Sequence, residues 1–236
     1  MILTVLGNNG PFPAPGGACS GYLVESDSGD TRVLVDCGAG VLANLNRLLT
    51  PDQLTAVILT HLHFDHMSDM LPMRYQLDVS PRLSLPVYAP DSPVGVVNML
   101  TGGKLDLYEP EDGMIGEMRV SYIPAVHPVK ANCVCIECDG AKLVLTGDTN
   151  ENPALELFAD GADLLVADAG FLEADWQPGK PHLSALKCGQ LAQSVGAKQL
   201  LLTHLNPKYA PQALLDEART ACTHASLAEI GRRYAV

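Results

Sequence analysis

Short runs of leucine and β-branched residues recur along this chain, and polar or turn-forming residues follow each run. The runs occupy residues 31–36, 56–60, 142–146, 163–167 and 199–203. Four or five successive apolar residues are typical of strands that are buried on both faces of a sheet. The sequence therefore predicts a protein built around well-covered β-sheet.

Helical patterns lie between and after these runs, at residues 41–49, 67–77, 153–158, 184–195 and 211–222. Residues 1–7 are typical of a first strand. Residues 118–138 are typical of antiparallel strands, with Cys138-Asp139-Gly140 offering a hairpin turn. The strands outnumber those of a simple repeat of strand, helix and strand. We therefore predict an α/β fold in which two sheets are sandwiched between helices.

Composition fits one domain. The chain has 236 residues, 47% hydrophobic and 18% charged, which is enough to bury a sizeable core, and no linker interrupts residues 1–236. No apolar stretch approaches the roughly 20 residues that span a bilayer, so we expect no membrane partner. The seven cysteines are scattered and odd in number, which favours the reducing cytoplasm over a disulfide framework. Cys133, Cys135 and Cys138 lack a second Cys/His pair nearby, so we expect packed thiols there.

Residues that can bind metal follow several predicted strands. The strand at 56–60 leads directly into His61-Leu62-His63-Phe64-Asp65-His66, and His127, Asp148 and His204 stand at the ends of other segments. Side chains at strand ends are where α/β proteins place active sites. Because His61 and His63 stand two apart, they point to one side of an extended backbone, while Asp65 and His66 approach from another direction. One loop can therefore serve two metal ions.

The hexapeptide is a specific signal. At the frequencies of this chain, His-x-His-x-Asp-His arises by chance on the order of twice per million start positions, so a merely solvated polar loop explains it poorly. His127 or His204 alone would be a weak signal. Their weight comes from the hexapeptide and from their order along the chain.

Together these residues resemble the ligand series of the metallo-β-lactamase-fold hydrolases. The segments Ser20-Gly21-Tyr22-Leu23-Val24, Val35-Asp36-Cys37-Gly38 and Pro181-His182-Leu183-Ser184 are similar to the ribonuclease Z and phosphodiesterase branch of that family. The resemblance covers nearly the whole chain and implies an αββα sandwich, two mixed β-sheets flanked by helices, with the site along one edge of the sheets.

The resemblance also implies a role for each ligand. His61, His63 and His127 would bind one metal ion, Asp65, His66 and His204 would bind a second, and Asp148 would bridge the two. Imidazole and carboxylate donors suit Zn²⁺ best and are also acceptable to Mn²⁺ or Fe²⁺. Two such ions activate a bridging hydroxide and clamp phosphate oxygens, which makes a phosphodiester the natural substrate.

Three residues are expected to act in catalysis. Asp65 would hold the hydroxide, and His182 would give a proton to the leaving alkoxide or contact the phosphate, as the resemblance implies. Asp168, at the end of the strand at 163–167, would orient His182. The family more often has a glutamate in this role. Tyr22, Arg74 and Tyr75 are further candidates for a substrate wall, and the glycine-rich turn at 7–10 is a candidate border of the site.

Three substrate classes remain open. A small phosphodiester such as a cyclic nucleotide leads, because the net charge of −12 disfavours general attraction to nucleic acid. Ribonuclease Z-type tRNA 3′-end processing is the alternative, although the basic arm of that branch is missing: the short region between Asp148 and His182 is acidic. Thioesters or lactones on the same metals form the third class. A catalytically silent scaffold is disfavoured because all seven ligand positions are filled. The resemblance allows a homodimer.

Overall fold

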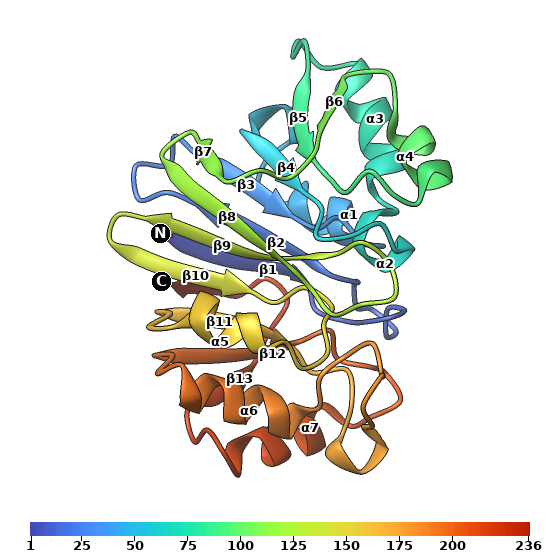
Figure 1. Ribbon diagram of the computed structural model, residues 1–236. Coiled ribbons are helices and arrows are strands. Elements are labelled where there is room, and N and C mark those ends of the chain that lie inside the picture. The colour runs from blue at the N-terminus through green and yellow to red at the C-terminus, as the bar shows by residue number, and fades with distance from the viewer.

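The computed structural model describes residues 1–236, and its strands form two seven-stranded mixed sheets (Figure 1). The first sheet has the order β14-β1-β2-β3-β4-β5-β6. Its strands are β1 Ile2–Gly7, β2 Gly21–Glu25, β3 Arg32–Val35, β4 Ala56–Ile58, β5 Leu85–Tyr88, β6 Leu105–Tyr108 and β14 Arg233–Ala235. The second has the order β13-β12-β11-β10-β9-β8-β7. Its strands are β7 Gly113–Ile115, β8 Met118–Pro124, β9 Asn132–Cys138, β10 Ala141–Leu145, β11 Leu164–Asp168, β12 Gln199–Thr203 and β13 Ala225–Leu227.

Helices cover the outer face of each sheet, so the layers follow the order helix, sheet, sheet, helix (Figure 1). The first sheet is covered by α1 Val41–Leu45, α2 Phe64–Met67, α3 Met70–Asp78 and α4 Val94–Leu100. The second is covered by α5 Pro153–Ala159, α6 Ala185–Ser194 and α7 Pro211–Arg219. Short 3₁₀ turns occupy Pro51–Gln53 and Glu173–Asp175. None of the helices is long and apolar enough to cross a bilayer.

Three apolar cores explain the uninterrupted apolar runs of the sequence. In β3, Val33 and Val35 pack between the two sheets, while Leu34 packs beneath the helices. In β12, Leu201 faces the other sheet and Leu200 faces α6 and α7. Because successive side chains of a strand point to opposite faces, a strand with both faces covered must be apolar throughout. The predicted αββα sandwich is confirmed.

Parallel pairing places several strand ends at one edge. In the first sheet β3 and β4 are parallel, and in the second β10, β11 and β12 are parallel. The carboxyl ends of parallel neighbours lie at the same edge of a sheet. Residues 36, 61, 148, 168 and 204, which end or follow these strands, are thereby brought to one region.

The helix predicted over residues 67–77 is divided in the structure. The helix α2 begins earlier, at Phe64, and α3 begins at Met70. Between them Asp69 donates its backbone amide to Cys37 and accepts hydrogen bonds from the amides of Gly40 and Leu42 at 2.9 Å. This segment pairs with the β3–α1 loop, so the helix is interrupted.

Other boundaries also differ. The helix predicted over 41–49 ends at Leu45, and the sequence did not predict β5, α4 and β6. The hairpin turn at Asp139-Gly140 is confirmed. Both residues have positive φ, 55° and 77°, as a tight two-residue turn requires.

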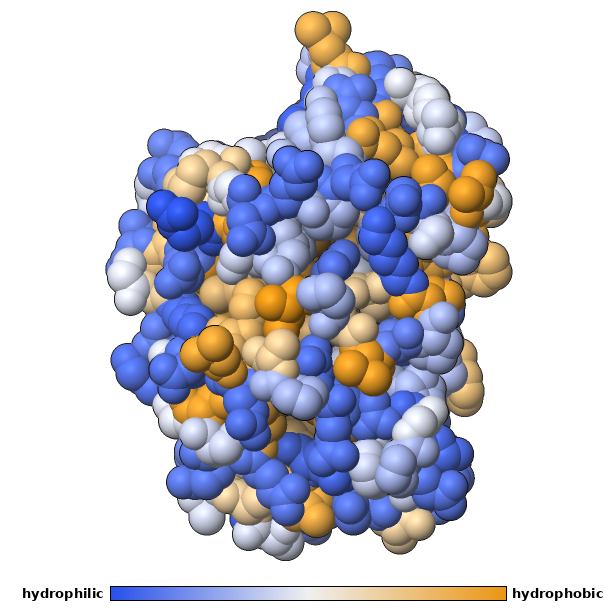
Figure 2. Space-filling view, in the orientation of Figure 1, coloured by the Kyte–Doolittle hydropathy of each residue, from blue (hydrophilic) through white to orange (hydrophobic).

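The surface is mostly hydrophilic on the face shown in Figure 2, with apolar residues gathered at the upper right over α3 and α4. All seven cysteines are buried and unpaired, as expected for packed thiols.

Candidate metal centre and active site

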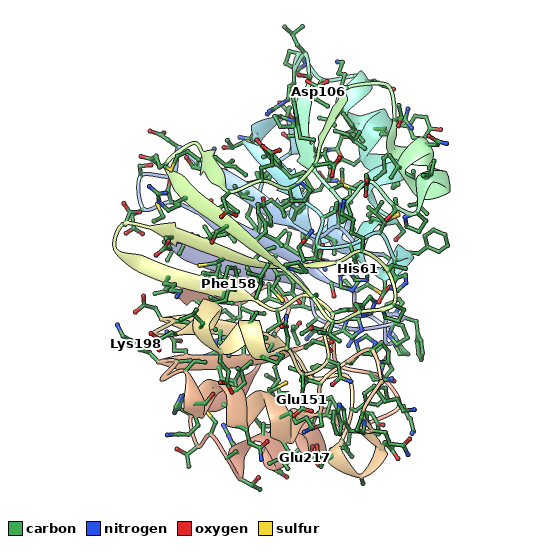
Figure 3. The ribbon with its side chains drawn as sticks, viewed as in Figure 1. His61, Asp106, Glu151, Phe158, Lys198 and Glu217 are labelled. Carbon is green, nitrogen blue, oxygen red and sulfur yellow. The ribbon has the colours of Figure 1, made fainter.

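The seven side chains predicted to bind metal lie together where the two sheets meet, in the region around His61 in Figure 3. They form two groups. Each group brings its ligand atoms within 4.8 Å of one another, and Asp148 belongs to both. The structure thus assembles residues that are up to 143 positions apart, counting from His61 to His204.

The first group consists of His61, His63, His127 and Asp148. His61 Nε2 lies 3.0 Å from His63 Nδ1, and His127 Nε2 lies 3.1 Å from the same nitrogen. Asp148 Oδ2 is 3.6 Å from His61 Nε2. Three imidazole nitrogens that converge on one point beside a carboxylate are a donor set that suits a divalent ion.

The second group consists of Asp65, His66, Asp148 and His204. Asp148 Oδ1 lies 3.2 Å from both His66 Nε2 and His204 Nδ1. Asp65 Oδ2 lies 3.6 Å from His66 Nε2 and 3.9 Å from His204 Nε2. The two oxygens of Asp148 therefore face different groups, which is the placement that a bridging carboxylate needs.

The second ring nitrogen of three histidines is held by the protein. His66 Nδ1 donates to Asp36 Oδ2 at 2.7 Å, and His127 Nδ1 donates to the carbonyl of Pro181 at 3.1 Å. His61 Nδ1 lies 3.2 Å from the hydroxyl of Thr60, which in turn donates to Asp36. Such contacts fix the ring orientation and leave the other nitrogen free for a metal.

Four buried side-chain atoms of the second group have no hydrogen-bond partner, and a cation bound among them would serve as their partner. Asp65 Oδ2, His66 Nε2, Asp148 Oδ1 and His204 Nε2 are buried without a hydrogen-bond partner. Buried polar atoms are almost always satisfied, so four orphans in one place need a common partner. A divalent ion bound among them would satisfy all four.

The protonation states of His61, His204 and Asp148 agree with metal binding. Burial lowers the pKa of His61 and His204 well below the usual value, so both rings are neutral and ready to act as ligands. Burial acts to raise the pKa of Asp148, but the neighbouring His204, His66 and His61 hold it well below the usual value. Asp148 is therefore a carboxylate.

His182 and Asp168 form a pair at the edge of the second group. His182 Nδ1 donates to Asp168 Oδ2 at 2.8 Å, and its ring lies 4.7 Å from the ring of His204. Asp168 is only 1% exposed and also accepts from the amides of Thr149 and Gly170, which fix its carboxylate. Burial acts to lower the pKa of His182, but Asp168 raises it to about 9, so the ring carries a proton at neutral pH.

Asp36 belongs to the site, although no role for it was derived from the sequence. It is buried, and besides His66 it accepts from the amide and hydroxyl of Thr60. A usable signal was present, because Asp36 directly follows β3, the strand beside the one that leads to His61. The backbone at Asp36 and at His204 has positive φ, 59° and 52°. Such strained positions in non-glycine residues are typical of functional sites.

Of the remaining positions that the sequence suggested, the turn at residues 7–10 lies at the site, whereas Tyr22, Arg74 and Tyr75 do not form a substrate wall. The turn at residues 7–10 does border the site, because a Cβ added to Gly10 would lie 1.9 Å from the ring of His204. Tyr22 is buried beneath the site and contacts Thr203 through its hydroxyl, so it is not a substrate wall. Arg74 donates to the carbonyl of Met99, and Tyr75 is exposed on α3. Neither takes part in the groups described above.

Comparison with known proteins gives a consistent result. Residues 31–205 match the family model described as the β-lactamase superfamily domain. The probable metallo-hydrolase YhfI of Bacillus subtilis is 33% identical over 229 residues, which cover 93% of each chain. The crystal structure of YhfI superimposes with a TM-score of 0.93 over 99% of each chain, at 30% identity.

More distant relatives come from the ribonuclease Z group. The ribonuclease Z of Methanopyrus kandleri is 26% identical over 260 residues, which cover 93% of this chain and 92% of that protein. The short form of human tRNase Z shares the fold, with a TM-score of 0.80 at 20% identity, over 100% of this chain and 99% of that one. Sequence match, fold and clustered ligands agree, and the chain therefore belongs to the metallo-β-lactamase superfamily of metal-dependent hydrolases.

Proposed function

We propose that this protein is a dinuclear phosphodiesterase that cleaves small phosphodiesters, with cyclic nucleotides as the first candidates. The observation that carries the proposal is the position of Asp148. It is shared by two groups of metal ligands, and the His182–Asp168 pair stands directly beside it. When bound, a pair of divalent ions, which we take to be Zn²⁺, supplies Lewis acidity toward phosphate oxygens and toward the attacking water.

The chain's own residues supply the proton transfers. Asp65 Oδ2 is buried and accepts no hydrogen bond from the protein, so beside its contact with a bound ion it can accept one from the attacking water and orient it. His182 carries a proton and is only 14% exposed at its side chain, so it can donate that proton to the leaving alkoxide oxygen. Asp168 fixes the ring of His182 through Nδ1, which leaves Nε2 for the substrate.

Charge and chain length favour a small substrate over tRNA. The net charge is −12, and proteins that grip nucleic acid through its phosphates need an excess of basic residues. Between Asp148 and His182 the chain forms α5, β11 and a short 3₁₀ turn, and no protruding basic arm is present. The relatedness to ribonuclease Z of M. kandleri keeps precursor tRNA as the second candidate.

The test is hydrolysis by purified protein loaded with Zn²⁺, Mn²⁺ or Fe²⁺, with and without a chelator. The substrates are a cyclic nucleotide, precursor tRNA, a thioester and a lactone. We expect metal-dependent hydrolysis of the cyclic nucleotide to be fastest. No phosphodiester cleavage by protein shown to hold two metals per chain would overturn the proposal, and cleavage of the thioester or lactone would then identify the other substrate class.

The role of His182 is tested separately with His182→Ala. Because a general acid matters most for a poor leaving group, we expect about a 10²- to 10⁴-fold lower kcat on the cyclic nucleotide. On a p-nitrophenyl ester, whose leaving group needs little protonation, the loss should be far smaller. His224→Ala is the matched control, since His224 is exposed and contacts the carbonyl of Ala197, at the end of β12 opposite to His204. Equal losses on both substrates, with metal content unchanged, would contradict a proton-donor role.

A further inference from the structure

Three of the four phenylalanines stand around the metal site. Phe64 lies between the ligands His63 and Asp65 and is 63% exposed. Phe12 is 54% exposed, and the ring of Phe171 lies 5.7 Å from the ring of His182. The fourth, Phe158, lies on α5 away from His61 and packs against the core (Figure 3).

The loop that carries Phe12 is fixed against the second ligand group. The backbone of Gly10 lies so close to the ring of His204 that no Cβ would fit between them. Asn9 accepts from the amide of Ala14 at 3.1 Å and donates to the carbonyl of Leu205 at 3.3 Å. Phe12 is therefore presented on a tethered loop, two residues from the backbone that covers His204.

Phe12 and Phe64 expose their aromatic rings to solvent next to the polar metal ligands. Leaving a large apolar side chain in water forfeits the free energy of its burial, which a stacked ligand would recover. Phe12 and Phe64 come from segments on different sides of the ligand cluster, one beside His204 and the other beside His63. A flat ring can stack on an exposed aromatic face, so each of these two side chains offers a stacking partner to a ligand bound at the site.

One lysine near His182 makes no ion pair or hydrogen bond with its ammonium group. Six of the seven lysines use their ammonium group in an ion pair or in hydrogen bonds to carbonyls, namely Lys104, Lys130, Lys142, Lys187, Lys198 and Lys208. Lys180 is the exception, and its Nζ lies 5.6 Å from the centre of the Phe171 ring.

The backbone around Lys180 is anchored to the site. The carbonyl of Lys180 accepts from Asn150 Nδ2 at 2.5 Å, and the next carbonyl, that of Pro181, accepts from His127. His182 follows. Lys180, the one lysine whose ammonium group makes no ion pair or hydrogen bond, thus stands two residues before the proposed proton donor, on an anchored backbone.

We propose that Phe12, Phe64 and Lys180 form a nucleotide subsite at the rim of the metal centre. The two rings stack on the base, and the ammonium group of Lys180 binds an anionic phosphate oxygen. The proposal rests on the proposed function and narrows it, since the substrate becomes a phosphodiester of a nucleoside. Every base has a flat face that can stack, so the subsite does not select one base over another. It favours substrates that carry a base over substrates that do not.

Two esters with the same leaving group test the aromatic part. The p-nitrophenyl ester of thymidine 5′-phosphate carries a base, and methyl p-nitrophenyl phosphate does not. In the Zn²⁺-loaded protein we expect a higher kcat/KM for the thymidine ester. Phe12→Leu and Phe64→Leu should each lower that preference about tenfold, because kcat/KM falls more for the thymidine ester than for the methyl ester. Phe158→Leu is the matched control and should keep the full preference. Metal content is measured for each variant, because Phe64 adjoins two ligands.

Lysine 180 is tested with the same esters. Both are anions, so Lys180→Gln should lower kcat/KM about five- to tenfold for each and weaken its dependence on salt. Lys198→Gln, at the opposite side of the molecule from His61 in Figure 3, is the control and should change neither. A Lys180→Gln variant that matches this control would overturn the role of Lys180.

The same experiments distinguish an error in the nucleotide subsite from an error in the proposed phosphodiesterase activity. If both esters are hydrolysed but Phe12→Leu and Phe64→Leu keep the wild-type preference, the aromatic subsite is wrong and the phosphodiesterase proposal stands. If neither ester nor the cyclic nucleotide is hydrolysed by protein that holds two metals per chain, the phosphodiesterase proposal fails, and binding of thymidine 5′-monophosphate by calorimetry decides the subsite. Weaker binding by both leucine variants supports it, and unchanged binding overturns it.

Discussion

Single residues outside the ligand set orient the metal centre, and Asp36 is the main example. Its carboxylate receives hydrogen bonds from His66 and from both the amide and the hydroxyl of Thr60, which itself contacts His61. One buried side chain thus fixes a ligand from each of the two groups. Contacts of this kind typically change metal affinity 10- to 100-fold.

Asp36→Asn should therefore weaken Zn²⁺ binding about 10- to 100-fold, because an amide presents only one acceptor oxygen to His66 and Thr60. Competition with a chelator of known affinity measures the effect. Asp106→Asn is the control, since Asp106 is exposed on β6 and away from His61 in Figure 3. Equal zinc affinity in both variants would show that Asp36 does not orient the ligands.

At the scale of elements, the loops that carry the ligands are packed backbone against backbone. A Cβ added to Gly38 would lie 1.9 Å from the carbonyl oxygen of Asp65. The amide of Cys37 donates to the carbonyl of His66 at 2.7 Å. The β3–α1 loop and the start of α2 therefore hold each other in place, and the ligands on α2 depend on this contact.

Two glycine substitutions should have opposite effects on stability. Gly38→Ala forces these loops apart, and we expect it to lower the free energy of unfolding by about 2–3 kcal/mol. A Cβ at Gly95, in α4, meets no atom within 4 Å, so Gly95→Ala should raise it by about 0.5 kcal/mol by restricting the unfolded chain. Urea unfolding measures both values. Similar values for the two variants would refute the packing argument.

Asp163 ties the starts of the parallel strands of the second sheet together. Its carboxylate pairs with Lys198 at 2.5 Å and accepts from the amide of Lys142 at 2.7 Å. The hydrogen bonds from Lys198 and then from Lys142 lower the pKa of Asp163. The unfolded chain therefore binds this proton more readily than the folded one, so the contact stabilises the fold above about pH 4 and stops doing so as the pH falls below that value.

Asp163→Asn should lower the free energy of unfolding by about 1 kcal/mol at pH 7, because the partly buried amide of Lys142 loses a charged acceptor. The difference from wild type should shrink as the pH is lowered through 4 toward 3. Denaturant unfolding at several pH values tests this, and a difference that stays constant with pH would contradict it.

At the scale of the whole molecule, the cysteine thiols are shielded from solvent. All seven cysteines are buried, and burial raises the pKa of Cys19 and Cys135 to about 11 and that of Cys133 to about 12. The thiolate is the reactive form, so these groups are both shielded and protonated at neutral pH.

The folded protein should therefore react very slowly with a disulfide reagent such as dithionitrobenzoate at pH 7.5, and seven thiols should react once it is unfolded in guanidinium. Cys138 should react first in the folded state, because it ends β9 beside the hairpin turn. Rapid reaction of several thiols without denaturant would show that the cores open easily.

The molecule also shows why some elements could be predicted and others could not. Strands such as β11 and β12 lie in the middle of a sheet with both faces covered, so their apolar runs are visible in the sequence. The strands β13 and β14 have three residues each, and β5 and β6 lie toward one edge. These strands form because an adjacent strand offers them backbone hydrogen bonds. Which strand is adjacent is set by the tertiary fold and not by the local sequence.

The sequence by itself determined the layer architecture and the candidate metal-binding residues, because covered strands must be apolar throughout and because an improbable cluster of histidines and aspartates follows one of them. Only the tertiary structure decided that Asp36 orients two of the histidines, His66 directly and His61 through Thr60. It also decided that the backbone of Gly10 lies against the ring of His204, which stands 194 positions later in the chain. Those relations are set by which strands pair in parallel and which loops pack together, and local sequence does not encode such long-range contacts in a readable form.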